Sequence, residues 1–229
     1  MVVTRYFFVG LLILITSTFS YAQGIVVKYE TTYVIPDNDK MSKKLVAKMN
    51  TFQRPRIYSY LNGVSVYKWL GINSPLVEVD GRKFSAAQNR LPVFYKDFSA
   101  GRLYVVDMKN DSTTAAVAKL DGFNSWKILR YNKVILGHLC RKAVMTTKKG
   151  AVVEAWFATD IDILDGPETY FGLPGLILEV KKGIEITRAV KIEFKEPDPR
   201  DMAIPDFSNR ISYEKYLQNR RYYGRGVKH

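Results

Sequence analysis

A two-residue alternation of apolar and polar side chains is the feature that most constrains the fold of this chain. In residues 24–35, polar residues fall between the apolar odd positions: the odd apolar residues are Ile25, Val27, Tyr29, Tyr33 and Ile35, and the polar ones are Lys28, Glu30 and Thr32. This period is typical of a strand with one buried face and one solvated face. Similar strand-like segments are residues 56–69, 93–98, 103–108, 126–129, 134–146, 151–159, 176–181 and 184–194. The chain is therefore predicted to be mainly β.

Short turn sequences separate many of these segments. Asn62-Gly63 tolerates the positive φ angles of a type I′ turn and is the clearest hairpin signal. Other turns are expected at residues 99–102, 148–150 and 182–183. Roughly nine or ten strands joined by short turns predict a single antiparallel meander. Because free sheet edges must be protected, we expect a strongly curved or barrel-like sheet.

Two short helices are expected outside the strands. Met41, Leu45 and Met49 recur at four-residue spacing and predict one helix after the first strand. The acidic, proline-rich residues 196–201 mark the exit from the sheet. Beyond them, residues 211–223 predict a short helix or a basic tail. The expected organisation is a signal peptide (1–22), an antiparallel β domain (23–208) and a basic C-terminal tail (209–229).

The N-terminal segment has the pattern of a secretory signal. Arg5 precedes an apolar run over residues 6–19, and the small residues Ser20 and Ala22 fit a cleavage site. The run is shorter than the about 20 residues that a membrane-spanning helix needs. No Cys follows Ala22, so no lipid anchor is expected. The mature chain is predicted to be soluble, without a transmembrane span, in the periplasm or cell envelope.

Composition and motifs exclude several classes of site. One Cys and two His are too few for a Cys/His zinc cluster, a disulfide framework or a multi-histidine metal site. The motifs of serine hydrolases, zinc proteases, P-loop proteins and dinucleotide-binding proteins do not occur. We expect no cofactor and assign no catalytic or metal-ligating residue.

The C-terminal tail is basic and rich in tyrosine. It carries six Lys or Arg residues between Arg210 and Lys228 and one acid, Glu214, and the whole chain has a formal net charge of +13. Such a segment is either simply solvated or suited to a polyanionic surface. Because export argues against nucleic acid, phosphorylated lipid headgroups or lipopolysaccharide are the expected polyanions.

His138 and Cys140 lie two residues apart in a strand pattern, so their side chains share a face. A thiol beside an imidazole suits a thiol or hydrolytic enzyme. Their apolar neighbours Val134 and Leu136 favour a buried structural thiol at Cys140 instead.

Residues 172–177 read Gly-Leu-Pro-Gly-Leu-Ile, which is the string that names the GLPGLI family of secreted Bacteroidota proteins. The surrounding sequence resembles that family through Trp126, the Gly-x-x-Cys-x-Lys-Ala run at 137–143, the Glu-Ala-Trp-Phe run at 154–157 and the Gly-Pro pair at 166–167. The resemblance implies export in a Bacteroidota cell envelope and a mainly antiparallel β fold. It implies no mechanism, because the family is largely uncharacterised.

The signature encodes a tightly shaped loop. Pro174 fixes its own φ angle, while Gly172 and Gly175 permit angles that other residues avoid. One interpretation is a plug in which Leu173 and Leu176 seal the core. The other is a binding loop, whose candidate residues are Tyr170, Phe171, Gly172, Leu173, Pro174 and Gly175.

Four acids precede the signature and form the expected rim of such a binding loop: Asp160, Asp162, Asp165 and Glu168. They also suggest a metal-handling loop over residues 160–168. An EF-hand would need a Gly where Asp165 stands and a Glu where Phe171 stands, so that match fails.

These observations lead us to expect a non-enzymatic envelope protein that binds an apolar or lipid-like ligand or an outer-membrane partner. The alternatives are a thiol or hydrolytic enzyme using Cys140 and His138, and a metal-handling protein using residues 160–168.

We predict cleavage after Ala22, because Ser20 and Ala22 occupy the positions that signal peptidase reads. Intact-mass measurement of the mature protein should give a chain that begins at Gln23. A protein that still carries Arg5 in the membrane fraction would contradict this.

Overall fold

The computed structural model describes residues 24–34, 43, 47, 50, 55–70, 77–79, 82–84, 92–109, 112–207 and 209–224. The predicted signal peptide lies outside these residues. So does most of the helix expected over residues 41–49, of which Lys43 and Ala47 are described and are helical.

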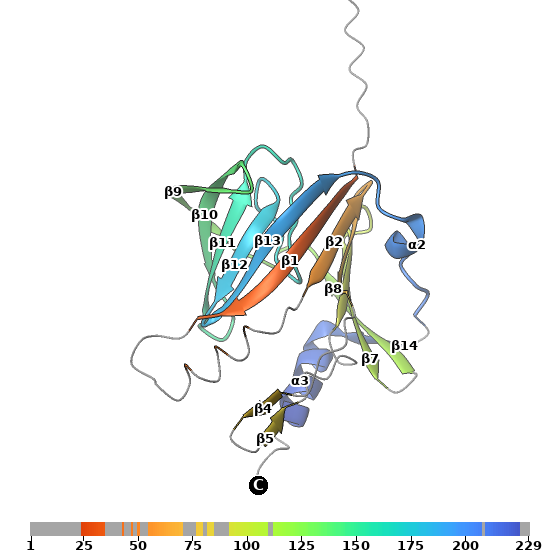
Figure 1. Cartoon of the computed structure of the whole chain (residues 1–229). Coiled ribbons are helices and arrows are strands. Elements are labelled where there is room, and N and C mark those ends of the chain that lie inside the picture. Colours follow the sequence, from red (N-terminus) through yellow and green to blue (C-terminus); the bar gives the residue numbers. More distant parts are fainter. Residues whose placement is uncertain are drawn as a thin grey trace, which may run out of the picture.

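The described strands form a 12-stranded sheet in the order β14-β8-β7-β6-β3-β2-β1-β13-β12-β11-β10-β9, and a separate pair, β4-β5 (Figure 1). The bounds of the first eight strands are β1 Ile25–Tyr33, β2 Arg56–Leu61, β3 Val64–Trp69, β4 Val77–Val79, β5 Arg82–Phe84, β6 Val93–Asp97, β7 Arg102–Lys109 and β8 Ser112–Lys119. Those of the rest are β9 Lys127–Ile135, β10 His138–Thr146, β11 Val152–Ala158, β12 Ile177–Lys182, β13 Glu185–Phe194 and β14 Asn209–Ser212. The prediction of a mainly β, mostly antiparallel chain is confirmed.

The strand order departs from the single meander that the sequence predicts. One ladder runs outward from β1 to β8, and a second runs back from the edge strand β9 to β13. The two ladders join where β13 pairs antiparallel with β1, from Ile25↔Phe194 to Tyr33↔Glu185. The sheet is open, with β14 and β9 at its edges, so the expected closure into a barrel-like sheet is not observed.

The C-terminal segment contributes a strand and a helix to the fold. β14 pairs with β8 in parallel, from Asn209↔Thr114 to Ser212↔Val117, which an antiparallel meander does not allow. The helix α3 (Tyr213–Gly224) follows directly, as one of the two alternatives predicted. Tyr216 of α3 is buried in the main core. The proline-rich exit holds the short helix α2 (Pro199–Met202), capped by Asp198.

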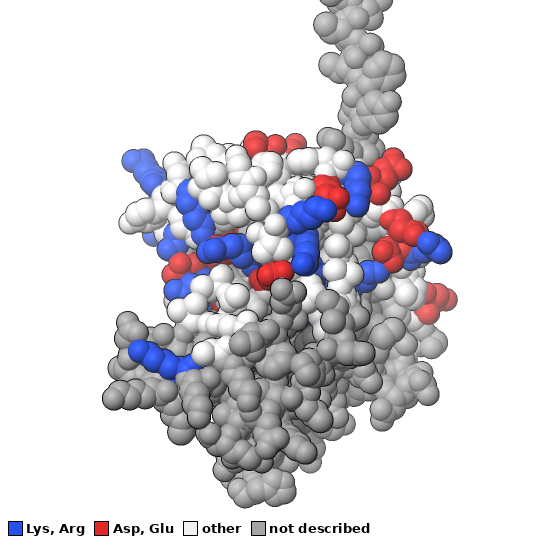
Figure 2. Space-filling model, viewed as in Figure 1, with Lys and Arg blue, Asp and Glu red and all other residues white. Residues whose placement is uncertain are grey.

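The outward face of the central strands carries mixed charge. Lys28 pairs with Glu30 on β1, and Lys191 pairs with Glu193 on β13, each at 3.2 Å. Figure 2 shows basic and acidic side chains interspersed over the part of this face where β13 and β1 lie. Such interspersed charge is typical of a solvated sheet face.

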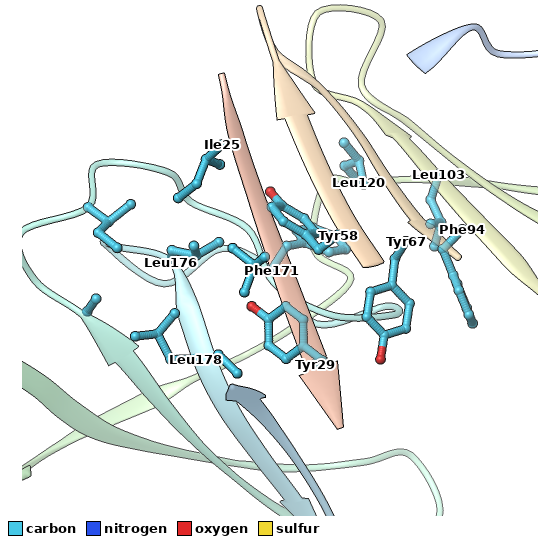
Figure 3. Packing of buried hydrophobic residues seen from close by; sticks show 14 of the residues in the cluster. Ile25, Tyr29, Tyr58, Tyr67, Phe94, Leu103, Leu120, Phe171, Leu176 and Leu178 are labelled. Atoms are coloured by element: carbon cyan, nitrogen blue, oxygen red, sulfur yellow. The ribbon is translucent and has the colours of Figure 1, made fainter. Parts of the chain in front are cut away.

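The opposite face holds an aromatic core. Tyr29, Tyr58 and Tyr67 come from β1, β2 and β3 and are almost fully buried (Figure 3). The ring of Tyr29 packs edge-on against Tyr58 and Tyr67, with centroids 6.4 and 5.9 Å apart. The register explains this packing, because Tyr58 lies directly opposite Tyr67 and so shares its face.

A buried ion pair lies beside these rings. The ammonium of Lys96, on β6, pairs with the carboxylate of Asp165, in the connection between β11 and β12, and both side chains are fully buried. Lys96 Nζ also donates to the carbonyl oxygen of Gly166 at 2.7 Å, and the Tyr58 hydroxyl donates to Asp165 Oδ2 at 3.0 Å. Burial lowers the pKa of Lys96, while Asp165 opposes that change. This network therefore fastens the second ladder to the first.

We predict that Lys96→Met and Asp165→Asn each destabilise the fold strongly. Removing one partner leaves a buried charge or polar group uncompensated, which costs about 3–5 kcal/mol, a large part of the roughly 5–15 kcal/mol that stabilises a typical domain. The midpoint of urea unfolding measures the effect. As a control, Lys191→Met removes an exposed cation and should change the midpoint little. If Lys96→Met unfolds at the parent's midpoint, the pair does not fasten the ladders.

Candidate functional site

The signature loop lies in the connection from β11 to β12, residues 159–176, which folds back on itself through backbone hydrogen bonds. The Gly172 amide donates to the Leu164 carbonyl at 2.9 Å, and the Leu176 amide donates to the Ile161 carbonyl at 3.1 Å. Leu173 and Leu176 are fully buried, as the plug interpretation predicts.

The aromatic residues proposed as ligand contacts also face the core. Phe171 packs against Phe98 and Phe123, with ring centroids 6.2 and 5.6 Å apart, and Tyr170 packs against Trp126 at 6.3 Å. The Trp126 indole N–H donates to the Phe171 carbonyl at 2.9 Å. Of the six binding-loop candidates, Tyr170, Phe171, Leu173 and Gly175 are buried and only Gly172 and Pro174 are exposed. The loop thus presents little side-chain surface to a ligand.

The four acids do not form one rim. Asp165 is fully buried in the ion pair with Lys96, which corrects the expectation that it faces solvent. Asp160 is exposed and lies 2.8 Å from His138 Nδ1, and Asp162 is exposed. Within the part of the chain that the structure describes, no three His, Cys, Asp or Glu residues converge as metal ligands.

Cys140 and His138 are neighbours without forming a nucleophile and base. The Cys140 thiol is buried in the main core and donates to the backbone carbonyl of His138 at 3.5 Å, not to its imidazole. Burial raises the pKa of the thiol to about 11, so at neutral pH it is almost entirely protonated. The imidazole instead lies beside Asp160 and the ring of Phe194.

The β9–β10 hairpin corrects the prediction of one strand over residues 134–146. The structure breaks this segment at a turn in which Leu136 has φ 51° and Gly137 has φ 86°. The Asn62-Gly63 turn has nearly the same φ angles, 49° and 80°, and there Asn62 suits the left-handed conformation. Leucine disfavours this conformation, so Gly137 was the one turn signal that the sequence carried at this point.

Exposed apolar side chains surround this turn. Val134, Leu136 and Leu139 are 66%, 47% and 51% exposed, and Val134 lies directly opposite Leu139 in the β9–β10 ladder. Tyr131, further along β9, is 63% exposed. The two strands carry five basic residues and no acid: Lys127, Arg130, Lys133, Arg141 and Lys142. The hairpin therefore combines an apolar tip with basic flanks at the edge of the sheet.

The bases nearest β11 are held by aromatic and acidic partners. Lys133 Nζ lies 4.4 Å from the centre of the Trp156 ring and 2.7 Å from Glu179 Oε1. Lys142 pairs with Glu154 at 2.8 Å, which lowers the pKa of that carboxyl. These contacts anchor the hairpin to the sheet and leave Arg141 exposed near its tip.

In comparisons with known proteins, part of the chain matches a family of unknown function. Residues 144–179, which include the signature, match a family described as "Protein of unknown function (Porph_ging)". No curated protein matches the chain in sequence. Among the described residues, no helix has the length and apolar character needed to cross a membrane.

The chain is similar to two solved structures of PNGF-II, in C2 and P21 space groups, each with a TM-score of 0.59 and 14% sequence identity. The likeness covers 86% of this chain and 32% or 33% of the PNGF-II chain. An uncharacterised conserved protein from Thermus thermophilus has a TM-score of 0.43 and 5% identity over 83% of this chain and 91% of its own. The chain thus spans about a third of the length of PNGF-II, and at this identity the likeness shows the fold alone.

The two signature glycines give a matched test of the plug. A Cβ on Gly175 would lie 1.8 Å from the carbonyl oxygen of Ala158, whereas a Cβ on Gly172 meets nothing within 4 Å. Both residues have positive φ angles. We predict that Gly172→Ala costs about 1–2 kcal/mol of stability through backbone strain alone, and that Gly175→Ala costs clearly more because the backbone must also move. Thermal unfolding of both variants decides this, and equal melting temperatures would contradict the packed-loop geometry.

Proposed function

We propose that this protein is an exported, non-enzymatic cell-envelope protein of the GLPGLI family that contacts a lipid surface through its β9–β10 hairpin. The signal-like N-terminus and the signature in residues 172–177 support export and the family. The raised pKa of Cys140 weighs against the thiol enzyme. The pairing of Asp165 with Lys96 weighs against a metal-handling loop.

The observation that carries this proposal is the backbone conformation of Leu136. A non-glycine residue in the left-handed region costs of order 1–3 kcal/mol. Burial of the side chain does not offset this cost, because Leu136 is 47% exposed. A strained residue that presents an apolar side chain to solvent supports a role in contact with a partner.

The surroundings of Leu136 favour an anionic lipid surface as that partner. Val134 and Leu139 add exposed apolar area, and Tyr131 adds an amphipathic ring of the kind found at membrane interfaces. Of the five bases on the hairpin strands, Lys133 and Lys142 are paired with Glu179 and Glu154. Lys127, Arg130 and Arg141 remain exposed, and each exposed base near an anionic membrane surface adds about 1 kcal/mol of attraction. Apolar insertion together with basic flanks is the usual arrangement for reversible binding at a lipid surface.

We predict that Leu136→Asn lowers binding of the mature protein to vesicles of phosphatidylglycerol and phosphatidylcholine several-fold, without lowering the melting temperature. Asn tolerates the left-handed conformation, so the turn should keep its shape or become more stable while the apolar tip is lost. Vesicle co-sedimentation measures the binding, and thermal unfolding measures the stability.

Leu164→Asn is the matched control, because Leu164 is 53% exposed and lies outside the hairpin. This variant should bind like the parent. Binding of the parent should fall in pure phosphatidylcholine and at high salt, since the basic flanks act electrostatically. The proposal would be refuted if the parent protein did not bind anionic vesicles, or if the Leu136→Asn variant bound them as well as the parent.

A further inference from the structure

Arg56, the first residue of β2, is a buried cation without an anionic partner among the described residues. Its side chain lies on the face that carries Tyr58, and the residue is only 8% exposed. Its Nε and Nη1 atoms are shielded from solvent and have no hydrogen-bond acceptor in the part of the chain that the structure describes. Its Cζ lies 5.8 Å from the centre of the Tyr67 ring. That cation–π contact attracts the charge but accepts no hydrogen bond from these two atoms.

Trp69 supplies a second unsatisfied donor beside Arg56. The two residues lie directly opposite each other in the β2–β3 ladder, so their side chains share a face. The indole Nε1 of Trp69 is also buried, and no acceptor in the described part of the chain bonds to it. On the other side of Arg56 the register places Tyr29 of β1. Guanidinium and indole nitrogens only donate, so neither group satisfies the other.

The acidic residues near this site do not accept hydrogen bonds from the Arg56 and Trp69 donors. Burial raises the pKa of the Tyr67 hydroxyl, Glu168 and Glu185 raise it further, and Arg56 opposes them. Both carboxylates thus lie within electrostatic range of this ring. No salt bridge within the described residues joins either of them to Arg56. A buried polar group without a partner is rare in folded proteins, and it points to an acceptor that the described part of the chain does not provide.

We propose that Arg56 and Trp69 form a binding site for an oxyanion, the carboxylate or phosphate group of a ligand. The Nε and Nη1 donors point to opposite sides of the guanidinium, so an oxyanion engages one of them together with Nη2 in a planar fork that matches both groups. The Trp69 N–H adds a third donor from the neighbouring strand. The rings of Tyr29 and Tyr67 restrict water around the fork, which strengthens its hydrogen bonds. The site is independent of the hairpin proposal, since β1, β13, β12 and β11 lie between β2 and β10 in the sheet.

The indole N–H signal of Trp69 provides a direct test. The chain has 3 Trp residues, so ¹⁵N-labelled mature protein should give few indole cross-peaks, and Trp69→Phe identifies the one required. We expect this peak to shift saturably with sodium phosphate or sodium acetate, but not with sodium chloride at equal ionic strength. Trp126, whose N–H already bonds to the Phe171 carbonyl, is the internal control. If neither phosphate nor acetate shifts the Trp69 indole peak, the proposal is wrong.

Variants of Arg56 test the role of the guanidinium. Arg56→Met should reduce the affinity for the oxyanion at least about tenfold, as expected when a charge-assisted contact is lost. Its melting temperature in oxyanion-free buffer should not fall, because an unpaired buried cation is removed. Arg56→Lys keeps the charge without the fork and should bind more weakly than the parent. If Arg56→Met does not fold, the cation is structural and the proposal fails, as it does if Arg56→Lys binds like the parent.

Two further arms identify the source of the oxyanion and separate this proposal from the hairpin. Hexanoate and hexyl phosphate carry the same groups on an alkyl chain. If hexanoate and hexyl phosphate bind more tightly than acetate and phosphate, the natural oxyanion is the head group of a lipid-like molecule. If the two pairs bind equally, it is a free ion. Leu136→Asn should leave the Trp69 response unchanged, and Arg56→Met should leave vesicle binding unchanged. Loss of both activities in either variant would contradict the independence of the two sites.

Discussion

The contact of Lys96 with Asp165 links the two strand ladders away from their β1–β13 junction. Lys96 comes from the ladder that starts at β1, and Asp165 comes from the connection between β11 and β12 in the other. A charge removed from water is stable only beside its partner, so the connection must place Asp165 accurately. The Tyr29 hydroxyl, which donates to the Ile177 carbonyl at 2.6 Å, fastens the same connection at its end.

This constraint accounts for the form of the signature loop. With Asp165 fixed and the Gly175 backbone lying close to Ala158, little freedom remains between them. Leu173 and Leu176 are buried in the core beneath the loop, and Phe171 packs against Phe98 and Phe123. The segment that matches the uncharacterised family, residues 144–179, contains the loop side of this arrangement, while Phe98 and Phe123 lie outside it. Packing therefore accounts for Leu173, Gly175 and Leu176 of the signature.

The two proposed functional features are places where packing does not explain the residue that is present. At Leu136 the backbone is strained and the apolar side chain remains exposed. At Arg56 a cation is buried without an acceptor among the described residues. Folding stability alone favours Asn at the first position and an apolar residue at the second. Each residue makes physical sense when a partner outside the chain completes its surroundings.

The sequence by itself determined the local structure. Alternation predicted most of the strands, and Asn62-Gly63 predicted its hairpin, because both signals act between neighbouring residues. For the turn at Leu136 it carried only Gly137, because Leu136 itself opposes the turn, and for the parallel pairing of β14 it carried no signal, because that pairing depends on a distant strand. Only the tertiary structure decided that Asp165 is buried, that Arg56 meets no anion among the described residues, and that β13 returns to β1. Lys96 and Asp165 are 69 residues apart, and Tyr29 and Ile177 are 148 apart. No periodicity or turn signal spans such separations, since these pairs meet only when the whole sheet has formed.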